Sequence, residues 1–559
     1  MIGALRGYRP AWLRADLLAG ITLAAVAIPE AMGYSTIAGV PVSAGLYTLI
    51  VPTALFALLG ASRLMVVGAD SATAALLASG IAALGIAGLA SGTPQWLAMT
   101  SIVALLCGAL LLIAWILRLG FLGDFLSTAA LTGFLAGVGV SVLLGQLPAI
   151  LGLGHHEGRA WHRIPAFLRD LQHANPWAIG FAVVTVAALL LGQRFAPRFP
   201  TAVVVVAGSI ALVWLAGLQD RLPVVGDLQA GLPRVRIPQG LTVSTAVQLL
   251  PLAAGCALVI LAQSAATARS FAQRDGETAD VNRDLLGLAA GNAGAAFTGT
   301  FVVNGSPTKT EFLADQHART QVANLVLSAS TLVVALFAGP ALARLPHAVL
   351  GGIVALIAVR LIDVDELRAI WKVRRTEFVI AAATAATVLV FGVRDGIVLA
   401  VVASLIEIIR RQYRPEKFVV GIRGDGGREY VTAAPGAQSM PGLIVFRYDA
   451  DLFYANAGRF TDDVIGLIRA APDPVRWLVL DCSSIADVDY SAARELNGLI
   501  DFVHARGAHF VLAGADAELQ QTLKEEGILA LINADHVFHG VGSAVRAYRV
   551  EHPEAGESA

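Results

Sequence analysis

Two short polar segments, rich in glycine and hydroxyl side chains, interrupt sequence that is otherwise strongly apolar. The first, residues 67–73, carries Asp70, and the second, residues 303–311, carries Ser306 and Lys309. In lipid, irregular polar backbone must line a protein cavity, because nothing else satisfies its amides. The first amides of a helix and its positive dipole end attract anions. Two half-helices that begin at these segments would therefore form an anion site near the middle of a membrane.

Hydroxyl groups and one cation strengthen this predicted site. Ser71 and Ser306 stand at the expected helix starts, and Lys309 adds a positive charge. Each serine could instead cap its helix or pack between helices. Lys309 could pair with the nearby Glu311, or with Glu30 or Asp70, and such a pair would be structural or gating. Asp70 could hold a coupling cation, take up a proton, or cap its own helix.

A carboxylate also falls within the first apolar stretch, which begins at Leu17. Pro29 removes a backbone donor and is expected to kink or break the helix, and Glu30 follows at once. A carboxylate at membrane depth is costly and is by default a functional residue. Because a buried carboxyl can take up a proton near neutral pH, we predict that Glu30 couples protons to the substrate. The alternative is a structural partnership with a buried arginine or with backbone amides.

A third polar stretch, residues 261–272, lies within a later apolar run. Gln263 and Thr267 are four residues apart and therefore share one helix face. They could line the same cavity or form a hydrogen bond between helices.

The composition indicates a membrane protein. Hydrophobic residues make up 56% of the chain, and charged residues make up 14%. Between residues 17 and 117 the charged side chains are Glu30, Arg63 and Asp70. Because one pass needs about 20 apolar residues, the apolar runs predict about 12–14 passes. Clusters of basic residues are expected to lie in the cytoplasm, and they place both termini there. Two cytoplasmic termini require an even number of passes, which favours fourteen passes. The clusters include Arg9, Arg14, Arg269, Arg274, Arg283, Arg368, Lys372, Arg374, Arg375, Arg410, Arg411 and Arg414.

The end of the chain differs in charge and pattern. Residues 416–559 hold 21 acidic and 12 basic residues, a net charge of −9, whereas the whole chain carries −1. This change predicts a membrane domain at 1–415, a linker at 416–440 and a cytosolic domain at 441–559. Strand-like and helix-like segments alternate in the last part, which predicts an α/β sheet; they are residues 442–449, 457–470, 477–481, 491–505 and 510–514.

Eight short motifs follow one another between residues 28 and 321, and a C-terminal domain of α/β type follows them. They are residues 28–35 (IPEAMGYS), 38–41 (AGVP), 45–47 (GLY), 58–63 (LLGASR), 67–68 (VG), 267–272 (TARSFA), 304–306 (NGS) and 319–321 (RTQ). As an ordered set they resemble the sulfate permease family, the bacterial relatives of solute carrier family 26. The resemblance implies an α-helical polytopic membrane protein with fourteen spans, arranged as two inverted repeats of seven. It also implies core and gate domains, followed by a cytosolic α/β domain of the STAS type.

The resemblance also implies which residues contact the substrate. It matches Glu30 to a first-span site position and Tyr34 to an aromatic residue beside the substrate. The remaining contacts fall at the starts of the third and tenth spans; these are Asp70, Ser71, Ala72, Asn304, Gly305, Ser306, Thr308 and Lys309. Gln263 and Thr267 are predicted contacts because of their shared helix face. Gln263 stands where sodium-coupled bicarbonate relatives look to have a carboxylate. This difference argues against sodium coupling, although Asp70 could substitute. Ser491, at a predicted helix start, fits a position that is phosphorylated in soluble relatives of the last domain, or it is a simple N-cap.

The predicted function is secondary active transport of a small anion, such as sulfate, bicarbonate or a dicarboxylate. Proton-coupled symport by an elevator-like movement is favoured over sodium-coupled bicarbonate uptake or anion exchange. More remote alternatives are a passive channel and a membrane receptor. Cys107, Cys256 and Cys482 show no metal or disulfide spacing, and no nucleophile–base pair suggests an enzyme. We therefore expect no cofactor and no nucleic acid partner, and we expect a homodimer in the bacterial inner membrane with a possible cytosolic partner for the last domain.

Overall fold

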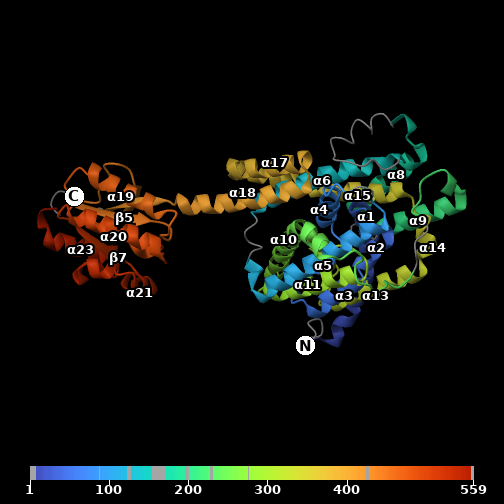
Figure 1. The fold of residues 1–559 in the computed structure, drawn as a ribbon, viewed down its shortest axis with the longest axis horizontal. Coiled ribbons are helices and arrows are strands. Elements are labelled where there is room, and N and C mark those ends of the chain that lie inside the picture. The colour runs from blue at the N-terminus through green and yellow to red at the C-terminus, as the bar shows by residue number, and fades with distance from the viewer. Residues whose placement is uncertain are drawn as a thin grey trace. The chain divides into compact units, whose positions relative to one another are not determined.

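The computed structural model of the chain describes residues 8–86, 89–121, 127–153, 171–195, 201–226, 231–274, 276–422 and 427–555. The chain forms two compact units, Met1–Leu405 and Ile406–Ala559, and helix α18 (Val393–Tyr413) runs across this boundary (Figure 1). The predicted end of the membrane domain, residue 415, lies just after α18.

The first unit is almost entirely helical, and its elements fall into two successive sets. The first set is α1 (Leu13–Ala38), α2 (Val42–Thr48), α3 (Val51–Leu59), β1 (Val66–Gly68), α4 (Ser71–Ala82), α5 (Pro94–Ile116), α6 (Thr128–Leu151), α8 (Pro176–Phe195) and α9 (Thr201–Ala216). The second is α10 (Val243–Arg274), α11 (Val281–Phe297), β2 (Asn304–Ser306), α12 (Pro307–Asp315), α13 (Val322–Phe337), α14 (Gly339–Leu342), α15 (His347–Leu361), α16 (Val364–Val373), α17 (Arg375–Val390) and α18. In each set, a short strand and a half-helix follow the first helices. This order, with the antiparallel pairing of β1 and β2, is that of two inverted repeats.

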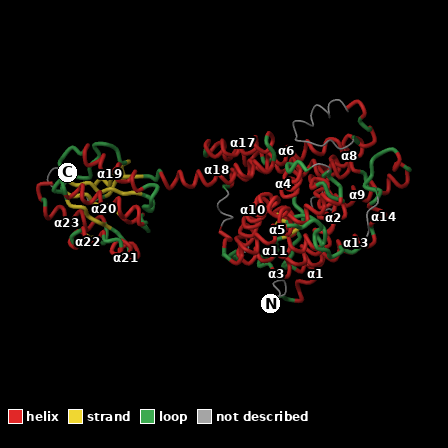
Figure 2. Tube along the Cα trace, viewed as in Figure 1, coloured by secondary structure: helices red, strands yellow, loops and turns green. Residues whose placement is uncertain are grey.

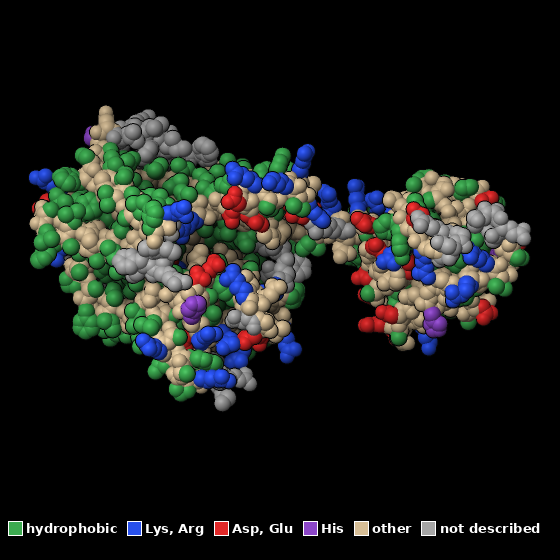
Figure 3. Space-filling model, turned by 180° about the vertical axis from the view of Figure 1, so that it is seen from behind, with side chains coloured by type: hydrophobic (Ala, Val, Ile, Leu, Met, Phe, Trp, Pro, Cys, Tyr) green, Lys and Arg blue, Asp and Glu red, His purple; other side chains and the backbone are tan. Residues whose placement is uncertain are grey.

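Six helical stretches of the described residues are long and apolar enough to cross a membrane: Pro10–Ala38, Val42–Leu59, Pro94–Ile116, Thr128–Leu151, Val243–Arg274 and His347–Val373. Hydrophobic side chains cover much of the visible outer face of this unit (Figure 3). Because a bilayer would solvate such a surface, the unit is an integral membrane domain. The count of fourteen passes stays a prediction.

Pro29 was expected to kink or break its helix; α1 continues through it to Ala38, so of these two the break is wrong. Proline lacks only its own amide hydrogen, and packing on several sides of the helix retains the remaining turns. Glu30 and Tyr34 therefore lie one helical turn apart on one continuous helix, not in an unwound segment. The helix ends at Gly39, whose φ of 71° is the left-handed conformation that glycine adopts without strain.

The second unit is an α/β domain built on a six-stranded sheet (Figure 2). The strand order is β4-β3-β5-β6-β7-β8, and β5 to β8 are parallel. Alternate strand residues pack against α19, α20 and α21 on one face and against α23 on the other. The five predicted strands and helices are confirmed within one residue; they are β5 (Leu443–Tyr448), α19 (Ala457–Ala470), β6 (Trp477–Asp481), α20 (Tyr490–His504) and β7 (His509–Ala513). The sequence did not predict the elements that follow, which are α21 (Ala517–Glu525), α22 (Ile528–Leu531), β8 (Val537–Phe538) and α23 (Val541–Glu551).

The segment expected to be a linker belongs partly to this sheet. Residues 416–440 contain β3 (Lys417–Ile422) and β4 (Arg428–Thr432), and β3 pairs antiparallel with both β4 and β5. The alternation of side chains in β3 buries Val419 and Val420 on opposite faces of the sheet. Charged residues around these strands hid this pattern in the sequence.

Candidate functional site

The two polar segments meet as a pair of antiparallel strands. Val66 lies opposite Ser306, and Gly68 lies opposite Asn304. Because antiparallel strands run in opposite directions, α4 and α12 leave from opposite ends of the pair, with their N-termini turned toward it. The glycine in β2 permits close packing, since a Cβ atom on Gly305 would lie 2.7 Å from Ser264 Oγ.

Two buried carboxylates fix the loops on either side of this strand pair. Asp284 Oδ1 accepts hydrogen bonds of 2.8 Å from the amides of Ala61 and Ser62, just before β1. Asp16 accepts from the amides of Arg319 and Thr320, after α12, at 2.6 and 3.1 Å. Each carboxylate thus serves as the hydrogen-bond acceptor for buried backbone amides that water does not reach. The sequence reading did not identify either residue, because each contact joins distant parts of the chain.

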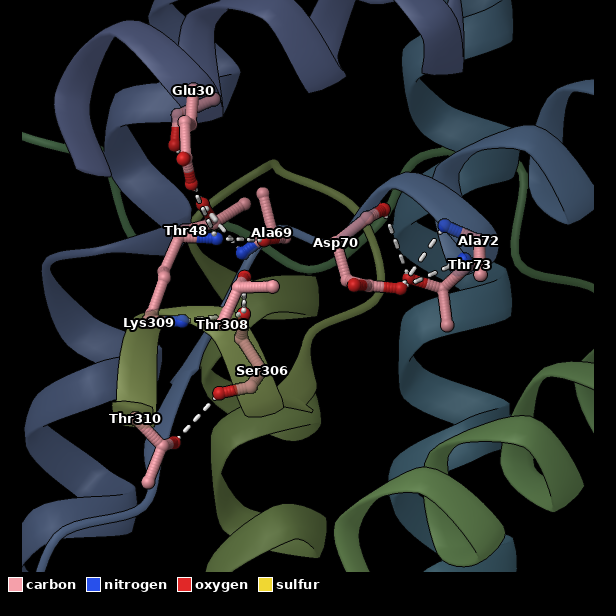
Figure 4. Close-up of polar contacts among 11 residues, drawn as sticks. Glu30, Thr48, Ala69, Asp70, Ala72, Thr73, Ser306, Thr308, Lys309 and Thr310 are labelled. Carbon is pink, nitrogen blue, oxygen red and sulfur yellow. Dashed lines mark hydrogen bonds and ion pairs between the residues drawn. The ribbon is translucent and has the colours of Figure 1, made fainter. Parts of the chain in front are cut away.

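Asp70 is the N-cap of α4. Its carboxylate accepts from the amides of Ala72 and Thr73 at 3.0 and 3.4 Å, as Figure 4 shows. Of the alternatives predicted for Asp70, the structure thus shows the helix cap. The carboxylate accepts from two of the helix amides that were expected to bind an anion. The amide of Ser71 comes before them and has no intrahelical acceptor.

Ser306 caps α12 in the same way. Its Oγ accepts from the amide of Lys309 at 3.4 Å and lies 3.3 Å from the hydroxyl oxygen of Thr308. Pro307 has no amide hydrogen, so the amide of Thr308 is the first that α12 can offer. In the described part of the chain, one amide at each helix start, that of Ser71 and that of Thr308, has no protein acceptor.

Lys309 lies at the centre of the arrangement. Its side chain is 1% exposed, and Nζ donates to the carbonyl of Ala69 at 2.9 Å. The same Nζ lies 3.5 Å from Glu30 Oε2 and 4.8 Å from the centre of the Tyr34 ring. Figure 4 shows Glu30 and Lys309 converging from α1 and α12 on the segment that precedes α4. The predicted pairing of Lys309 is thus with Glu30, and the ammonium group joins both half-helices to α1.

Glu30 is held more loosely than Lys309. Its side chain is 19% exposed, and among the described residues Oε2 is buried without a hydrogen bond. The carboxylate of Glu30 therefore has one cationic partner, Lys309, and no hydrogen bond at this oxygen.

The amide side chains join β2 to α10. Gln263 Oε1 accepts a short hydrogen bond from Asn304 Nδ2, and Ser264 Oγ donates to Asn304 Oδ1 at 3.0 Å. The amide of Gly305 donates to Ser264 Oγ at 3.1 Å. Thr267 donates to the carbonyl of Gln263, one turn earlier in the helix. These groups therefore position the strand pair, and Gln263 lies at the site while Thr267 lies one turn away from it.

One further cation, Arg360, lies in the last turn of α15, a helix that packs against α1. Arg360 is exposed and makes no ion pair within the described ranges. Helix α15 approaches α1 closely, since a Cβ on Gly33 would lie 2.5 Å from Val354 Cγ2. The sequence reading missed Arg360 because a single arginine at the end of an apolar run resembles an ordinary cytoplasmic anchor.

A cavity of about 440 Å³ lies beside the same core and takes in one predicted site residue, Thr267. Its other walls come from Trp12, residues 60–65, residues 277–280 and Arg283, together with neighbouring residues. The Lys309–Glu30 pair is not among its lining residues, so this cavity is separate from the strand pair.

Ser491 is exposed in the first turn of α20, but it is not the N-cap. Asp489 caps the helix and accepts from the amides of Ala492 and Tyr454, each at 2.8 Å. The expectation that Ser491 is a simple N-cap is therefore wrong, and its hydroxyl stays accessible to solvent.

Comparison with known proteins identifies the family. Residues 13–384 match the sulfate permease family, and residues 434–544 match the STAS domain. The chain belongs to the sulfate permease family. It is 34% identical over 546 residues to the "Probable sulfate transporter Rv1739c" of Mycobacterium tuberculosis, covering 97% of both chains. It is 26% identical over 567 residues to "Sulfate transporter 3.2" of Arabidopsis thaliana, covering 97% of this chain and 87% of that one.

Solved structures share the fold of this anion transporter. The murine solute carrier 26 family member A9 in its inward-facing state has a TM-score of 0.87 at 21% identity, with 98% of this chain and 93% of that chain covered. The transmembrane domain of the cyanobacterial bicarbonate transporter BicA has a TM-score of 0.60 at 24% identity, with 71% and 98% covered. These similarities confirm the predicted polytopic membrane fold with a C-terminal STAS domain.

Proposed function

We propose that the protein is a secondary active transporter that carries a small oxyanion, with sulfate as the first candidate, together with a proton. The ion pair between Lys309 and Glu30, located where the two half-helices begin, is the observation that carries this proposal. The mycobacterial and plant relatives that are named sulfate transporters support the choice of sulfate as the first substrate to test.

The charges around the strand pair explain why a proton and an anion would bind together. With Glu30 and Asp70 ionised and Lys309 positive, the three side chains carry a net charge of −1, which disfavours an anion. Protonation of Glu30 makes this sum zero and releases Lys309 Nζ from its 3.5 Å partner. The two helix starts then remain as positive ends, each contributing about 0.3–1 kcal/mol when exposed and up to about 2 kcal/mol when partly buried. An anion would thus bind more tightly after Glu30 is protonated.

The coupling ion is proposed to be H⁺ rather than Na⁺. Gln263 provides a neutral carboxamide whose oxygen already accepts from Asn304. Asp70, the other candidate ligand for a cation, already accepts from two amides of α4. Neither group is therefore an uncommitted anionic ligand of the kind that would hold a sodium ion.

The transport movement is proposed to be elevator-like, with α1, α10 and the two half-helices moving together. The remaining helices include α6, α15 and α17, which pack closely through glycines. A Cβ on Gly137 would lie 2.7 Å from Val388, and one on Gly139 would lie 2.6 Å from the carbonyl of Ala358. Such close packing favours a rigid gate. Gly33 of α1 faces Val354 of α15, where the moving and fixed parts would meet.

The setting of this transporter is proposed from the charge pattern. The basic clusters favour the bacterial inner membrane with both termini in the cytoplasm. The STAS domain would regulate or assemble a homodimer, with Ser491 as a candidate modification site and a cytosolic protein as a possible partner.

Uptake of labelled sulfate into proteoliposomes, with pH or sodium gradients imposed separately, tests the proposal. Glu30→Gln should abolish accumulation driven by an inward proton gradient while leaving the protein folded. Glu311→Gln is the matched control, because Glu311 forms an exposed pair with Arg274 at 3.4 Å. Accumulation by Glu30→Gln equal to that of the wild type would rule out this role for Glu30. Uptake that requires an internal anion and ignores the pH gradient would identify an exchanger instead.

A further inference from the structure

Helix α16 is a short surface helix between two apolar helices. It spans Val364–Val373, with two residues between it and α15 and one residue between it and α17. Ten helical residues cover about 15 Å, whereas the hydrocarbon core of a bilayer is about 30 Å thick. Four of its ten residues are charged, and none is buried. Helix α16 forms the end of the candidate membrane-spanning stretch His347–Val373, and its charged residues place this end at the edge of the bilayer.

The large apolar side chains in the last two turns of α16 divide into a half-buried pair and an exposed pair. Leu367 and Ile370 are half-buried against the protein, but Trp371 is 48% exposed and Val373 is 80% exposed. Trp371 packs edge-on against Phe378 of α17 at 4.8 Å between ring centres, and this contact holds the indole in place. A fixed, half-exposed tryptophan on an amphipathic helix is typical of a position at the membrane interface.

Basic side chains gather at the C-terminal end of the helix. Arg368 pairs with Asp365 at 3.3 Å, both exposed, and the exposed Arg374 pairs with the half-buried Glu377 at 3.7 Å. Lys372 makes no ion pair or hydrogen bond within the described ranges. Four cations thus occur within eight residues of an interfacial helix, namely Arg368, Lys372, Arg374 and Arg375.

Arg375 lies close to the indole ring of Trp371. The guanidinium of Arg375 lies 5.5 Å from the centre of the Trp371 ring. Figure 3 shows a row of Lys and Arg side chains along the upper edge of the membrane unit, on the side where α17 lies in Figure 1. Basic residues also stabilise the C-terminal end of a helix dipole, so the cluster by itself is not a site. The second observation that points to a lipid is the exposed indole of Trp371 beside the unpaired Lys372. Acyl chains of a lipid would cover the indole, and its phosphate would pair with the ammonium group of Lys372.

We propose that the C-terminal end of α16 binds the headgroup of an anionic phospholipid, with Lys372 and Arg375 contacting the phosphate and Trp371 lying at the depth of the glycerol backbone. The partner is a lipid and not a soluble anion, because the exposed Val373 and Trp371 need an apolar phase beside the phosphate. The site is independent of the transport site and does not rest on the proposed coupling.

The test uses the full-length protein in phosphatidylcholine vesicles that contain brominated phosphatidylglycerol, or the same amount of brominated phosphatidylcholine. Quenching of Trp371 is measured as the difference in fluorescence between the wild type and Trp371→Phe. We expect stronger quenching by the anionic lipid. Lys372→Gln combined with Arg375→Gln should weaken the apparent affinity for phosphatidylglycerol about 30-fold, since each basic residue near an anionic surface contributes roughly a factor of five.

The control removes the same charge elsewhere, with Arg234→Gln and Arg236→Gln, and should leave the quenching unchanged. Native mass spectrometry of lipid adducts on the wild type and the Lys372/Arg375 variant gives a second measurement that does not depend on tryptophan. Equal quenching by both brominated lipids, or unchanged phosphatidylglycerol adducts in the variant, would overturn the proposal. A loss of adducts in both the variant and the control would also overturn it, because binding would then depend on net charge alone.

Discussion

Replacing Lys309 by alanine should expose the cost of leaving Glu30 unpaired. The two charged groups lie 3.5 Å apart, which at an effective dielectric constant of 20 corresponds to an attraction of about 5 kcal/mol. Removing one partner of a buried pair typically costs about 3–5 kcal/mol, since the remaining charge stays desolvated. Glu30 is 19% exposed and retains some water, so we expect the lower part of this range. Replacing both residues should cost less than replacing Lys309 alone.

The assay is unfolding in mild detergent by added sodium dodecyl sulfate, for Lys309→Ala, Glu30→Gln and the double variant. Lys524→Ala, an exposed lysine of the STAS domain, is the control and should change stability little. If the double variant loses as much stability as the two single variants together, the two side chains are not coupled and the geometry has been misread.

Three further predictions concern binding and pH. Arg360→Gln should weaken equilibrium binding of a divalent anion more than that of a monovalent one; equal losses would remove Arg360 from an electrostatic role. Ser306→Trp should block binding by filling the start of α12, and undiminished affinity would place the site elsewhere. Burial and the nearby His509 lower the pKa of His536 below its usual value of about 6.5. Since the unfolded state then binds the proton more readily, the STAS domain should lose stability as the pH falls from about 6.5, and His536→Asn should flatten that dependence; an unchanged slope would contradict it.

The chain's local chemistry was enough to predict the half-helices and the charged residues between them. Asp70 and Ser306 are N-caps in the structure, and cap preference depends on the residue itself and its neighbouring amides. The α/β pattern of the STAS domain was readable for the same reason, because the short continuous apolar runs of β5 and β6 are a local signal of buried strands. Helix α1 shows the limit of such reasoning, since packing retained the turns that Pro29 was expected to break.

The pairing of distant residues was decided only by the tertiary structure. Lys309 had three candidate partners in the sequence, Glu311, Glu30 and Asp70, and the approach of α1 selected Glu30. Cys107 and Cys256 appear unrelated in spacing, yet α5 and α10 bring their thiols into contact. The antiparallel pairing of Val66 with Ser306 likewise joins two repeats that are far apart in the chain. Membrane helices present similar apolar surfaces to lipid and to one another, so hydropathy determines which segments are buried in the bilayer, and close packing at small residues determines which of them meet.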